Sequence, residues 1–246
     1  MQAVLLAAGI GSRLRPITNS IPKCMVPIKG RPLLDYWMEI LGANKEITKI
    51  IINTHYLPDS VREYALKSQY LKKIELIHEE SLLGTAGTLK SVMGKIVNDD
   101  VLVAHADNLT LFTLREFIHS FRHRPDGCIA TMMTFETDDP ESCGVVKLDR
   151  RGVVQEFYEK VKNPPGNLAN GAVFIFSPEA LSIITGLEKS GVKEISIDVL
   201  PKLIGRINTF HNTIYHRDIG SPRSMSEAEI EFPRVYQKFK NKGIVR

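Results

Sequence analysis

The sequence predicts an α/β fold of three layers, with a mainly parallel mixed sheet between two layers of helices. Apolar runs of strand length alternate with helical patterns as far as residue 140, an order that is typical of parallel sheets covered by helices. A glycine-bearing loop directly follows the first apolar run. Beyond Pro140 the pattern changes to short strands around a tight turn, which predicts a small antiparallel portion. We expect one domain over residues 1–246, in two halves that divide at about residue 140.

The first half begins with Ala3–Ala7, a continuous apolar run of the kind found in strands buried on both faces. Asp59 and Ser60 lie where the second helical pattern starts, and both residue types favour a helix N-terminus. In chain order we expect strand 3–7, helix 33–41, strand 49–53, helix 58–67, strand 74–78, helix 85–97, strand 101–105, helix 113–123 and strand 129–135.

The second half contains Asp149–Gly152, which predicts a turn between two short strands. Pro233 falls inside the last helical pattern, where its missing N–H group favours a break or kink. In chain order we expect strands 145–148, 153–158 and 172–176, helices 178–187 and 197–204, strand within 207–216, and a closing helix over 222–240.

Composition limits the classes of function. Hydrophobic residues make up 43% and charged residues 24% of the chain, as in a soluble globular protein. The net charge of +4 suits a phosphate-rich ligand but is too small to indicate a nucleic-acid partner. The three cysteines show no CxxC spacing, which favours reduced thiols in the cytoplasm over disulfides or a zinc site. We expect no signal peptide before Gln2 and no membrane-spanning run.

The loop after the first strand has the features of a phosphate-binding loop. Gly9 and Gly11 lack a Cβ, so backbone N–H groups there can approach phosphate oxygens closely. Arg13 and Lys23 add positive charge that suits a triphosphate. Leu14 stands where a dinucleotide-binding loop needs its third glycine, and no Gly-Lys-Ser/Thr of a P-loop is present. A tight turn that needs the two glycines only for its own geometry is the alternative.

A longer pattern surrounds this loop, namely Ala7-Ala8-Gly9-x-Gly11-Ser12-Arg13-Leu14-x-Pro16-x-Thr18 and then Pro22-Lys23-x-Met25-x-Pro27-Ile28-x-Gly30-x-Pro32-Leu33. It closely resembles the signature of the sugar-phosphate nucleotidylyltransferase family. The resemblance implies a Rossmann-like nucleotidyltransferase fold, in which the first half binds the nucleotide and the second half, about 141–246, binds the acceptor. The nucleotide-binding residues that it implies are Leu6, Ala8, Gly9, Gly11, Ser12, Arg13, Lys23, Glu79, Gly84 and Thr85.

A second segment bears on the base. Leu83-Gly84-Thr85-Ala86-Gly87 opens a predicted helix, whose N-terminus adds partial positive charge. It looks like the version of this segment found in guanylyltransferases of the family, and the resemblance assigns the base-reading side chain to Glu79. A carboxylate complements the N1–H and N2–H₂ groups of guanine, which favours GTP and leaves UTP and CTP as alternatives.

Two aspartates are the candidate metal ligands. Asp107 follows the apolar strand 101–105, where a carboxylate is costly unless it meets a cation. Asp218 lies in a segment that resembles the family's Trp-x-Asp-x-Gly-Thr-Pro, with His216 in place of the tryptophan. The resemblance implies that both residues bind Mg²⁺, which in phosphate-binding sites is held by one or two carboxylates. Capping of the helix that begins at Pro222 is the alternative role for Asp218.

Three segments of the second half resemble the family's acceptor-binding segments. Cys143-Gly144-Val145-Val146 is similar to Tyr-Gly-Val-Val, and Phe157-Tyr158-Glu159-Lys160 is similar to Phe-x-Glu-Lys-Pro, with Val161 in place of the proline. Glu159 would accept from sugar hydroxyls and Lys160 would pair with the sugar phosphate; a plain surface ion pair is the alternative. The substrate-binding residues that the resemblance implies are Asn108, Gly144, Glu159, Lys160 and Asn170.

The resemblance thus implies an enzyme similar to mannose-1-phosphate or heptose-1-phosphate guanylyltransferases. It would transfer a nucleotidyl group from an NTP, with GTP favoured, to a sugar 1-phosphate and release pyrophosphate. The implied catalytic residues are Arg13, Lys23, Asp107 and Asp218. A cytidylyltransferase acting on phosphocholine or a similar phosphate is one alternative, and an inactive subunit that senses nucleotide sugars is another. The identity of the sugar and the formation of a homo-oligomer stay open.

Overall fold

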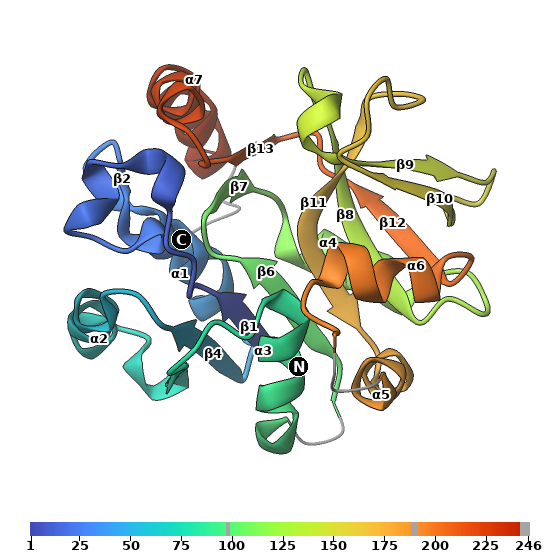
Figure 1. Cartoon of the computed structure of the whole chain (residues 1–246), viewed down its shortest axis with the longest axis horizontal. Coiled ribbons are helices and arrows are strands. Elements are labelled where there is room, and N and C mark those ends of the chain that lie inside the picture. The colour runs from blue at the N-terminus through green and yellow to red at the C-terminus, as the bar shows by residue number, and fades with distance from the viewer. Residues whose placement is uncertain (97–98, 188–190, 242–246) are drawn as a thin grey trace. The chain divides into compact units, whose positions relative to one another are not determined.

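The computed structural model describes residues 1–96, 99–187 and 191–241, and Figure 1 shows its elements. The chain forms two compact units. The first unit consists of Met1–Leu82, Ala104–Leu114 and Ile214–Arg246, and the second of Leu83–Val103 and Arg115–Thr213. The predicted mixed α/β class, with a mainly parallel central sheet and smaller antiparallel parts, is confirmed. The single domain stays a prediction.

Parallel strands form the centre of the first unit. β4 (Lys49–Thr54) pairs in parallel with β1 (Gln2–Leu6) on one side and with β5 (Ile74–His78) on the other. The apolar residues of β1 and β4 are buried, as the continuous apolar runs predict. The segment after β6 (Val101–His105) lies beside the end of β1, since Ala106 N donates to Leu6 O at 3.0 Å. The carboxyl ends of these strands share one edge, which is where α/β sheets bind ligands.

The helices of the first unit are α1 (Leu33–Gly42), α2 (Pro58–Lys67) and α7 (Pro222–Asn241). α2 packs against β5 and has the predicted bounds. α7 continues through Pro233, so the helix does not break there, and the alternative of a kink stays a prediction. The hydrogen bond lost at the proline is offset by the burial of the apolar face of α7, where Ala228, Phe232 and Phe239 are 2% exposed or less.

Two short strands that matter for the site form a sheet of their own. β7 (Asn108–Leu111) pairs antiparallel with β13 (Tyr215–Asp218). β13 overlaps the end of the range 207–216 in which we expected strand and extends beyond it to Asp218, whereas β7 was not predicted. Its four residues are too few for a periodic pattern, and its partner is far away in the sequence. β2 (Pro27–Ile28) and β3 (Arg31–Pro32) form another short antiparallel pair that was not predicted.

The second unit contains the predicted antiparallel strands. Its strands are β8 (Ala130–Glu136), β9 (Gly144–Leu148), β10 (Val154–Glu159), β11 (Leu168–Phe176) and β12 (Ile207–His211). β9 pairs antiparallel with β10 and β11, and β8 pairs antiparallel with β11 and parallel with β12. β11 begins at Leu168 rather than at the predicted Ala172. Ala172 has a φ of 50° within an irregular register, and this interruption hid the first part of the strand from the pattern.

The other helices are α3 (Thr85–Val92), α4 (Leu114–Arg122), α5 (Pro178–Gly186) and α6 (Leu200–Leu203). The prediction of one α-helix over 85–97 is wrong: α3 ends at Val92 and a 3₁₀ turn containing Gly94 follows, while Val97 lies outside the described residues. The prediction for 197–204 also needs correction. Ile195–Val199 is a π-helical turn, and only the four residues of α6 that follow it are α-helical.

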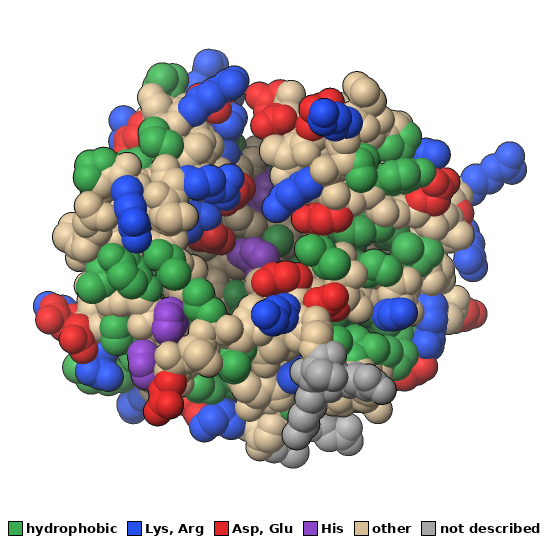
Figure 2. Space-filling model, in the orientation of Figure 1, with side chains coloured by type: hydrophobic (Ala, Val, Ile, Leu, Met, Phe, Trp, Pro, Cys, Tyr) green, Lys and Arg blue, Asp and Glu red, His purple; other side chains and the backbone are tan. Residues whose placement is uncertain are grey.

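Surface and thiol properties follow the composition. All three cysteines are free thiols; Cys24 and Cys128 are buried and Cys143 is partly buried. Figure 2 shows lysine and arginine side chains mixed with aspartate and glutamate on the visible face, as a net charge of +4 suggests. In the described part of the chain, every helix is too short or too polar to cross a lipid bilayer.

Candidate active site

Two aspartates and a lysine from distant parts of the chain meet in the first unit. Nζ of Lys23 lies 2.5 Å from Oδ2 of Asp107 and 3.2 Å from Oδ1 of Asp218. The lysine side chain is only 9% exposed, whereas the side chains of Asp107 and Asp218 are 25% and 55% exposed. Nη2 of Arg13 is 4.0 Å from Oδ2 of Asp218. The structure therefore brings together the four residues that were predicted to be catalytic.

Main-chain hydrogen bonds place the two aspartates side by side. Asp218 is the register partner of Asn108 in the β7–β13 pair, and Ile219 N donates to Asp107 O at 3.3 Å. From α1, Nε1 of Trp37 donates to Asn108 O at 2.9 Å. Asn108 is also 5% exposed. Its backbone, which pairs with Asp218 and accepts from Trp37, therefore helps to hold the aspartates in position.

A hydrophobic cluster fixes the three segments that bear the charged residues. Leu14, Leu109 and Ile219 are each 1% exposed or less and belong to this one cluster. Each follows a site residue by one or two positions in the sequence. Burial of one such side chain is worth about 1.5–3 kcal/mol, enough to hold charged neighbours near one another. The cluster also includes residues of α1 and α7, among them Leu33, Tyr36, Ala228 and Phe232.

Asp218 does not cap α7. The hydroxyl of Ser221 accepts from Ser224 N at 3.1 Å and so performs that role. Gly220, the residue before Ser221, allows a close approach: a Cβ there would lie 2.6 Å from Oδ2 of Asp218 and 2.8 Å from Nη2 of Arg13. The Asp218 carboxylate is thus directed to the cationic side chains.

The local charges set the protonation states. Burial alone would lower the pKa of Lys23, but the carboxylates of Asp107 and Asp218 outweigh burial and raise the pKa above its ordinary value. Burial alone would raise the pKa of Asp107, but Lys23 and His105 lower it below its ordinary value. Burial, followed by the charge of His105, lowers the pKa of His216 to about 3. The lysine–aspartate pair is therefore charged near neutral pH, and His216 is neutral.

The glycine loop has free space around Gly9 and close contacts around Gly11. Gly9 is exposed, and a Cβ at this position would have no atom within 4 Å. Gly11 has a φ of 68°, and a Cβ there would lie 2.9 Å from Cγ2 of Thr18 and 3.1 Å from Cβ of Lys23. Gly11 therefore needs to be glycine for reasons of conformation and space. Ser12 and Arg13 are exposed, whereas Leu6 and Ala8 are buried.

Glu79 lies in a network that joins β1, β4 and β5. Its carboxylate Oε1 accepts from Nδ2 of Asn53 at 2.8 Å, while Oδ1 of Asn53 accepts from Ala7 N at 2.6 Å. Glu79 N donates to Thr54 O at 2.8 Å, and Nδ1 of His55 donates to Glu79 O, also at 2.8 Å. Sequence reasoning missed Asn53 and His55. The available signal was a pair of polar residues at the end of an apolar strand, on the edge where ligands bind.

Gly84 and Thr85 belong to the second unit and are engaged there. Gly84 has a φ of 76°, and a Cβ would lie 2.4 Å from Lys193 O. The Thr85 hydroxyl donates to Oε2 of Glu194 and accepts from Ile195 N, both at 2.8 Å. These contacts fix the start of α3, and a nucleotide-binding role for the two residues stays a prediction.

Gly144 and Glu159, predicted to contact the acceptor, are register partners in the β9–β10 pair. A Cβ on Gly144 would lie 2.6 Å from both Oε2 of Glu159 and Cζ of Phe157. The missing Cβ therefore provides the space for Glu159. Lys160 follows with a φ of 50°, and its Nζ lies 3.7 Å from Oε1 of Glu159 while its side chain is 66% exposed.

Asn170 lies on β11, where the neighbouring Ala169 pairs with Val145 of β9. Its Oδ1 accepts from Ala172 N at 2.9 Å. Since this oxygen serves the irregular part of the strand, the amide NH₂ is the group of Asn170 that suits an acceptor atom of a ligand. Asn170 and Gly144 thus lie on strands that pair with each other.

The donor set in the first unit fits a small divalent cation. Within residues 1–96, 99–187 and 191–241, no three or more His, Cys, Asp or Glu side chains form a metal-binding group. Mg²⁺ at phosphate sites needs only one or two carboxylates, because waters and substrate oxygens complete its shell. The ammonium of Lys23, in contact with an oxygen of Asp107 and of Asp218, stands in for such a cation.

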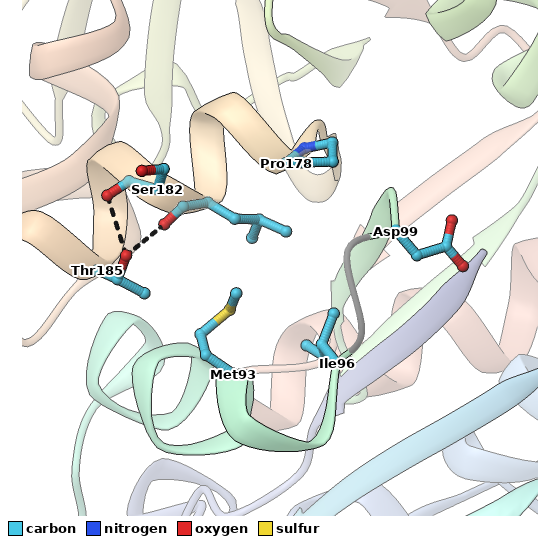
Figure 3. A pocket seen from close by; sticks show the side chains of 7 residues that line it. Met93, Ile96, Asp99, Pro178, Ser182 and Thr185 are labelled. Atoms are coloured by element: carbon cyan, nitrogen blue, oxygen red, sulfur yellow. Dashed lines mark hydrogen bonds between the residues drawn. The ribbon is translucent and has the colours of Figure 1, made fainter.

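A cavity of about 280 Å³ lies in the second unit, between the end of α3 and α5. Figure 3 shows Met93 and Ile96 facing Thr185 and Pro178 across it, with Asp99 at one side. The Thr185 hydroxyl donates to the carbonyl oxygens of Leu181 and Ser182. None of the predicted site residues lines this cavity.

The fold, the open glycine loop and the carboxylate–lysine cluster define an α/β protein suited to polyphosphate ligands. Comparison with known families narrows this class of protein to one family. Residues 2–233 match the family described as "Nucleotidyl transferase". The chain belongs to this family, which confirms the resemblance seen in the sequence.

Curated relatives cover almost the whole chain. A "putative mannose-1-phosphate guanyltransferase" of Sulfolobus acidocaldarius is 32% identical over 94% of this chain and 63% of the relative. A "mannose-1-phosphate guanylyltransferase" of Mycobacterium tuberculosis is 30% identical over 95% of this chain and 65% of the relative. The chain thus spans slightly less than two thirds of the length of these relatives.

Solved structures share the fold. A putative glucose-1-phosphate thymidylyltransferase from Bacillus anthracis, in complex with a sucrose, has a TM-score of 0.80 at 24% identity, over 93% of this chain and 94% of that one. HddC from Yersinia pseudotuberculosis, complexed with GMP-PN, has a TM-score of 0.76 at 27% identity, over 94% of this chain and 99% of that one. These neighbours confirm the Rossmann-like nucleotidyltransferase fold.

Proposed function

We propose that this chain transfers a guanylyl group from GTP to a sugar 1-phosphate and releases pyrophosphate, with Mg²⁺ as its cofactor. The main support is the contact of Asp107 and Asp218 with one ammonium group, because the same oxygens suit a shared divalent ion. Family membership and the names of the curated relatives support the class of reaction.

The reaction needs no protein nucleophile, since an oxygen of the sugar phosphate attacks the α-phosphorus and pyrophosphate leaves. Arg13 and Lys23 would bind and orient the polyphosphate, and Asp107 and Asp218 would hold Mg²⁺. When bound, the ion would offset the repulsion between the phosphates and stabilise the charge that develops in the displacement. Positioning and charge stabilisation are then the protein's contributions to the rate.

GTP is the proposed nucleotide for two reasons. Glu79 is a buried carboxylate, 5% exposed, and can accept from the two adjacent donors of guanine. A structural neighbour of this chain, HddC, was solved with the guanine nucleotide analogue GMP-PN. Mannose 1-phosphate is the proposed acceptor, because the relatives are named for it. It would be bound by Asn108, Gly144, Glu159, Lys160 and Asn170.

The cytoplasm is the proposed location. The three cysteines are free thiols, the state that the reducing cytoplasm maintains. A homo-oligomer stays a prediction.

A substrate panel tests the function. Pyrophosphate release is measured with each of GTP, UTP, CTP and ATP against mannose, glucose and heptose 1-phosphates and phosphocholine. The proposal expects the highest rate for GTP with a sugar 1-phosphate. Preference for CTP with phosphocholine would instead identify a cytidylyltransferase, and tight GTP binding without pyrophosphate release would identify a nucleotide-sugar sensor.

A further inference from the structure

We propose that Asn53 is a positioning residue that holds the Glu79 carboxylate in place for the nucleobase and so contributes to the selection of guanine. The inference rests on the proposed function and adds to it a residue that the sequence did not single out. Asn53 is 2% exposed at the carboxyl end of β4. There it is the register partner of Leu6 on β1 and of Ile77 on β5.

The partners of the Asn53 amide fix its orientation. The backbone N–H of Ala7 can only donate, so Oδ1 of Asn53 must be the atom 2.6 Å from it. An ionised carboxylate can only accept, so Nδ2 must be the atom 2.8 Å from Oε1 of Glu79. The same amide therefore contacts the start of the glycine loop and the carboxylate of Glu79.

The backbone of Glu79 is held as firmly as its side chain. Its N–H donates to Thr54 O and its carbonyl oxygen accepts from Nδ1 of His55, each at 2.8 Å. With the amide of Asn53, this makes three hydrogen bonds between Glu79 and the consecutive residues 53–55, of which Asn53 and His55 donate and Thr54 accepts. A buried carboxylate held in this way has one preferred direction rather than several rotamers.

A fixed direction matters most for a ligand that offers two donors side by side. Guanine offers N1–H and N2–H₂, whereas hypoxanthine, the base of inosine triphosphate (ITP), offers only N1–H. GTP and ITP therefore differ in the N2 amino group, which would be the second donor to the carboxylate. A site built to accept a ligand N–H discriminates against the analogue that lacks it, provided that the acceptor is held in position. The ratio of GTP to ITP affinity therefore measures how well Glu79 is held.

The test uses Asn53→Asp, which keeps an acceptor for Ala7 N but replaces the amide donor to Glu79 with a carboxylate that repels it. Dissociation constants for GTP and ITP are measured by titration calorimetry, with thermal unfolding as the check of folding. We expect the preference for GTP over ITP to fall by about tenfold, the factor that corresponds to one hydrogen bond to a charged group. Should Asn53→Asp not fold, Asn53→Ser, which lacks the amide donor, takes its place.

Two controls separate positioning from general damage. Asn208 on β12 is also a buried asparagine, and its Nδ2 donates to Oγ of Ser120 at 3.1 Å. Asn208→Asp should lower the melting temperature and leave the GTP-to-ITP ratio unchanged. In a Glu79→Ala background, Asn53→Asp should also leave the ratio unchanged, because Asn53 acts through Glu79.

An unchanged ratio in Asn53→Asp, or an equal fall with and without Glu79, would overturn the inference. Because binding is measured, this result does not depend on turnover. Absence of pyrophosphate release from the unmodified protein would instead count against the proposed function.

Discussion

Nζ of Lys23 lies 2.5 Å from Oδ2 of Asp107, although the two residues are 84 positions apart in the sequence. The same ammonium reaches Asp218 at 3.2 Å. Lys23 therefore offsets part of the negative charge of the two carboxylates at the point where a divalent ion would bind. An incoming Mg²⁺ has to compete with this ammonium, and a displaced Lys23 would be available to the phosphates of the nucleotide.

Lys23→Met should alter stability and ion binding in opposite directions. Without the ammonium the carboxylates of Asp107 and Asp218 repel each other. In metal-free buffer we expect the free energy of unfolding to fall by about 2 kcal/mol. Each kcal/mol corresponds to a fall of about 2–4 °C in melting temperature for a chain of this size. Added Mg²⁺ should then raise the melting temperature more than in the unmodified protein. Lys29→Met is the control, since Lys29 forms an exposed pair with Glu229. If Mg²⁺ raised the melting temperature equally in all three proteins, Lys23 would not compete with Mg²⁺ for the carboxylates.

Asp107→Asn should lower the rate of pyrophosphate release by at least about 100-fold, the usual scale for loss of a group that stabilises charge in the transition state. The fold should persist, because the hydrogen bond from Ile219 N to Asp107 O does not involve the carboxylate. Asp59→Asn removes a carboxylate that is 81% exposed on α2 and should not change the rate. Near-normal release by Asp107→Asn, with an unchanged circular dichroism spectrum, would remove Asp107 from the mechanism.

Gly144→Ala should weaken binding of the sugar phosphate specifically. The new Cβ would lie 2.6 Å from Oε2 of Glu159, so the carboxylate has to move. We expect KM for the sugar 1-phosphate to rise about tenfold, as for the loss of one hydrogen bond to a charged group, with KM for GTP unchanged. Gly166→Ala is the control, because a Cβ there has no neighbour within 4 Å. An equal rise in both KM values would argue against an acceptor role for Glu159.

His216 should make the protein less stable in mild acid. Its pKa falls from the ordinary 6.5 to about 3 in the folded chain, first through burial and then through His105. Between these two pH values His216 binds a proton in the unfolded chain but not in the folded chain. The free energy of unfolding therefore falls as the pH falls through this window. Since the residue is not fully enclosed, the loss at pH 5 is at most about 2 kcal/mol.

Urea unfolding at pH 7 and pH 5 measures this effect. The unmodified protein should lose more stability between the two pH values than His216→Gln, which has no titrating ring. Asp107, which also lies near His216, is present in both proteins and does not contribute to the difference. The same loss in both proteins would mean that His216 titrates normally.

The sequence predicted correctly those helices and strands whose own residues form a clear hydrophobic pattern. The bounds of α2, β5 and β6 match the predictions to the residue, because each is a periodic or continuous apolar run with clear ends. Departures occur where the helix type changes, as in the 3₁₀ turn with Gly94 that follows α3 and in the π-helical turn that precedes α6. Pro233 shows the converse, since packing keeps α7 intact across it.

The site was predictable only in part. A turn aspartate such as Asp218 is ambiguous in sequence, and only the family resemblance suggested that it lies near Asp107. The physical cause of that proximity is the pairing of β7 with β13, which β7's short sequence does not signal. Asn53 was missed for a similar reason, because its importance depends on hydrogen bonds to Ala7 and Glu79 that no local pattern predicts.

We propose that Asp107 and Asp218 together hold one divalent ion during the reaction. The Mg²⁺ dependence of pyrophosphate release, measured at saturating GTP and sugar 1-phosphate for the unmodified protein and for Asp218→Asn, tests this proposal. We predict no release in the presence of a chelator, and a half-saturating Mg²⁺ concentration at least about tenfold higher in Asp218→Asn. Full release with the chelator present, or the same Mg²⁺ dependence in both proteins, would contradict the claim.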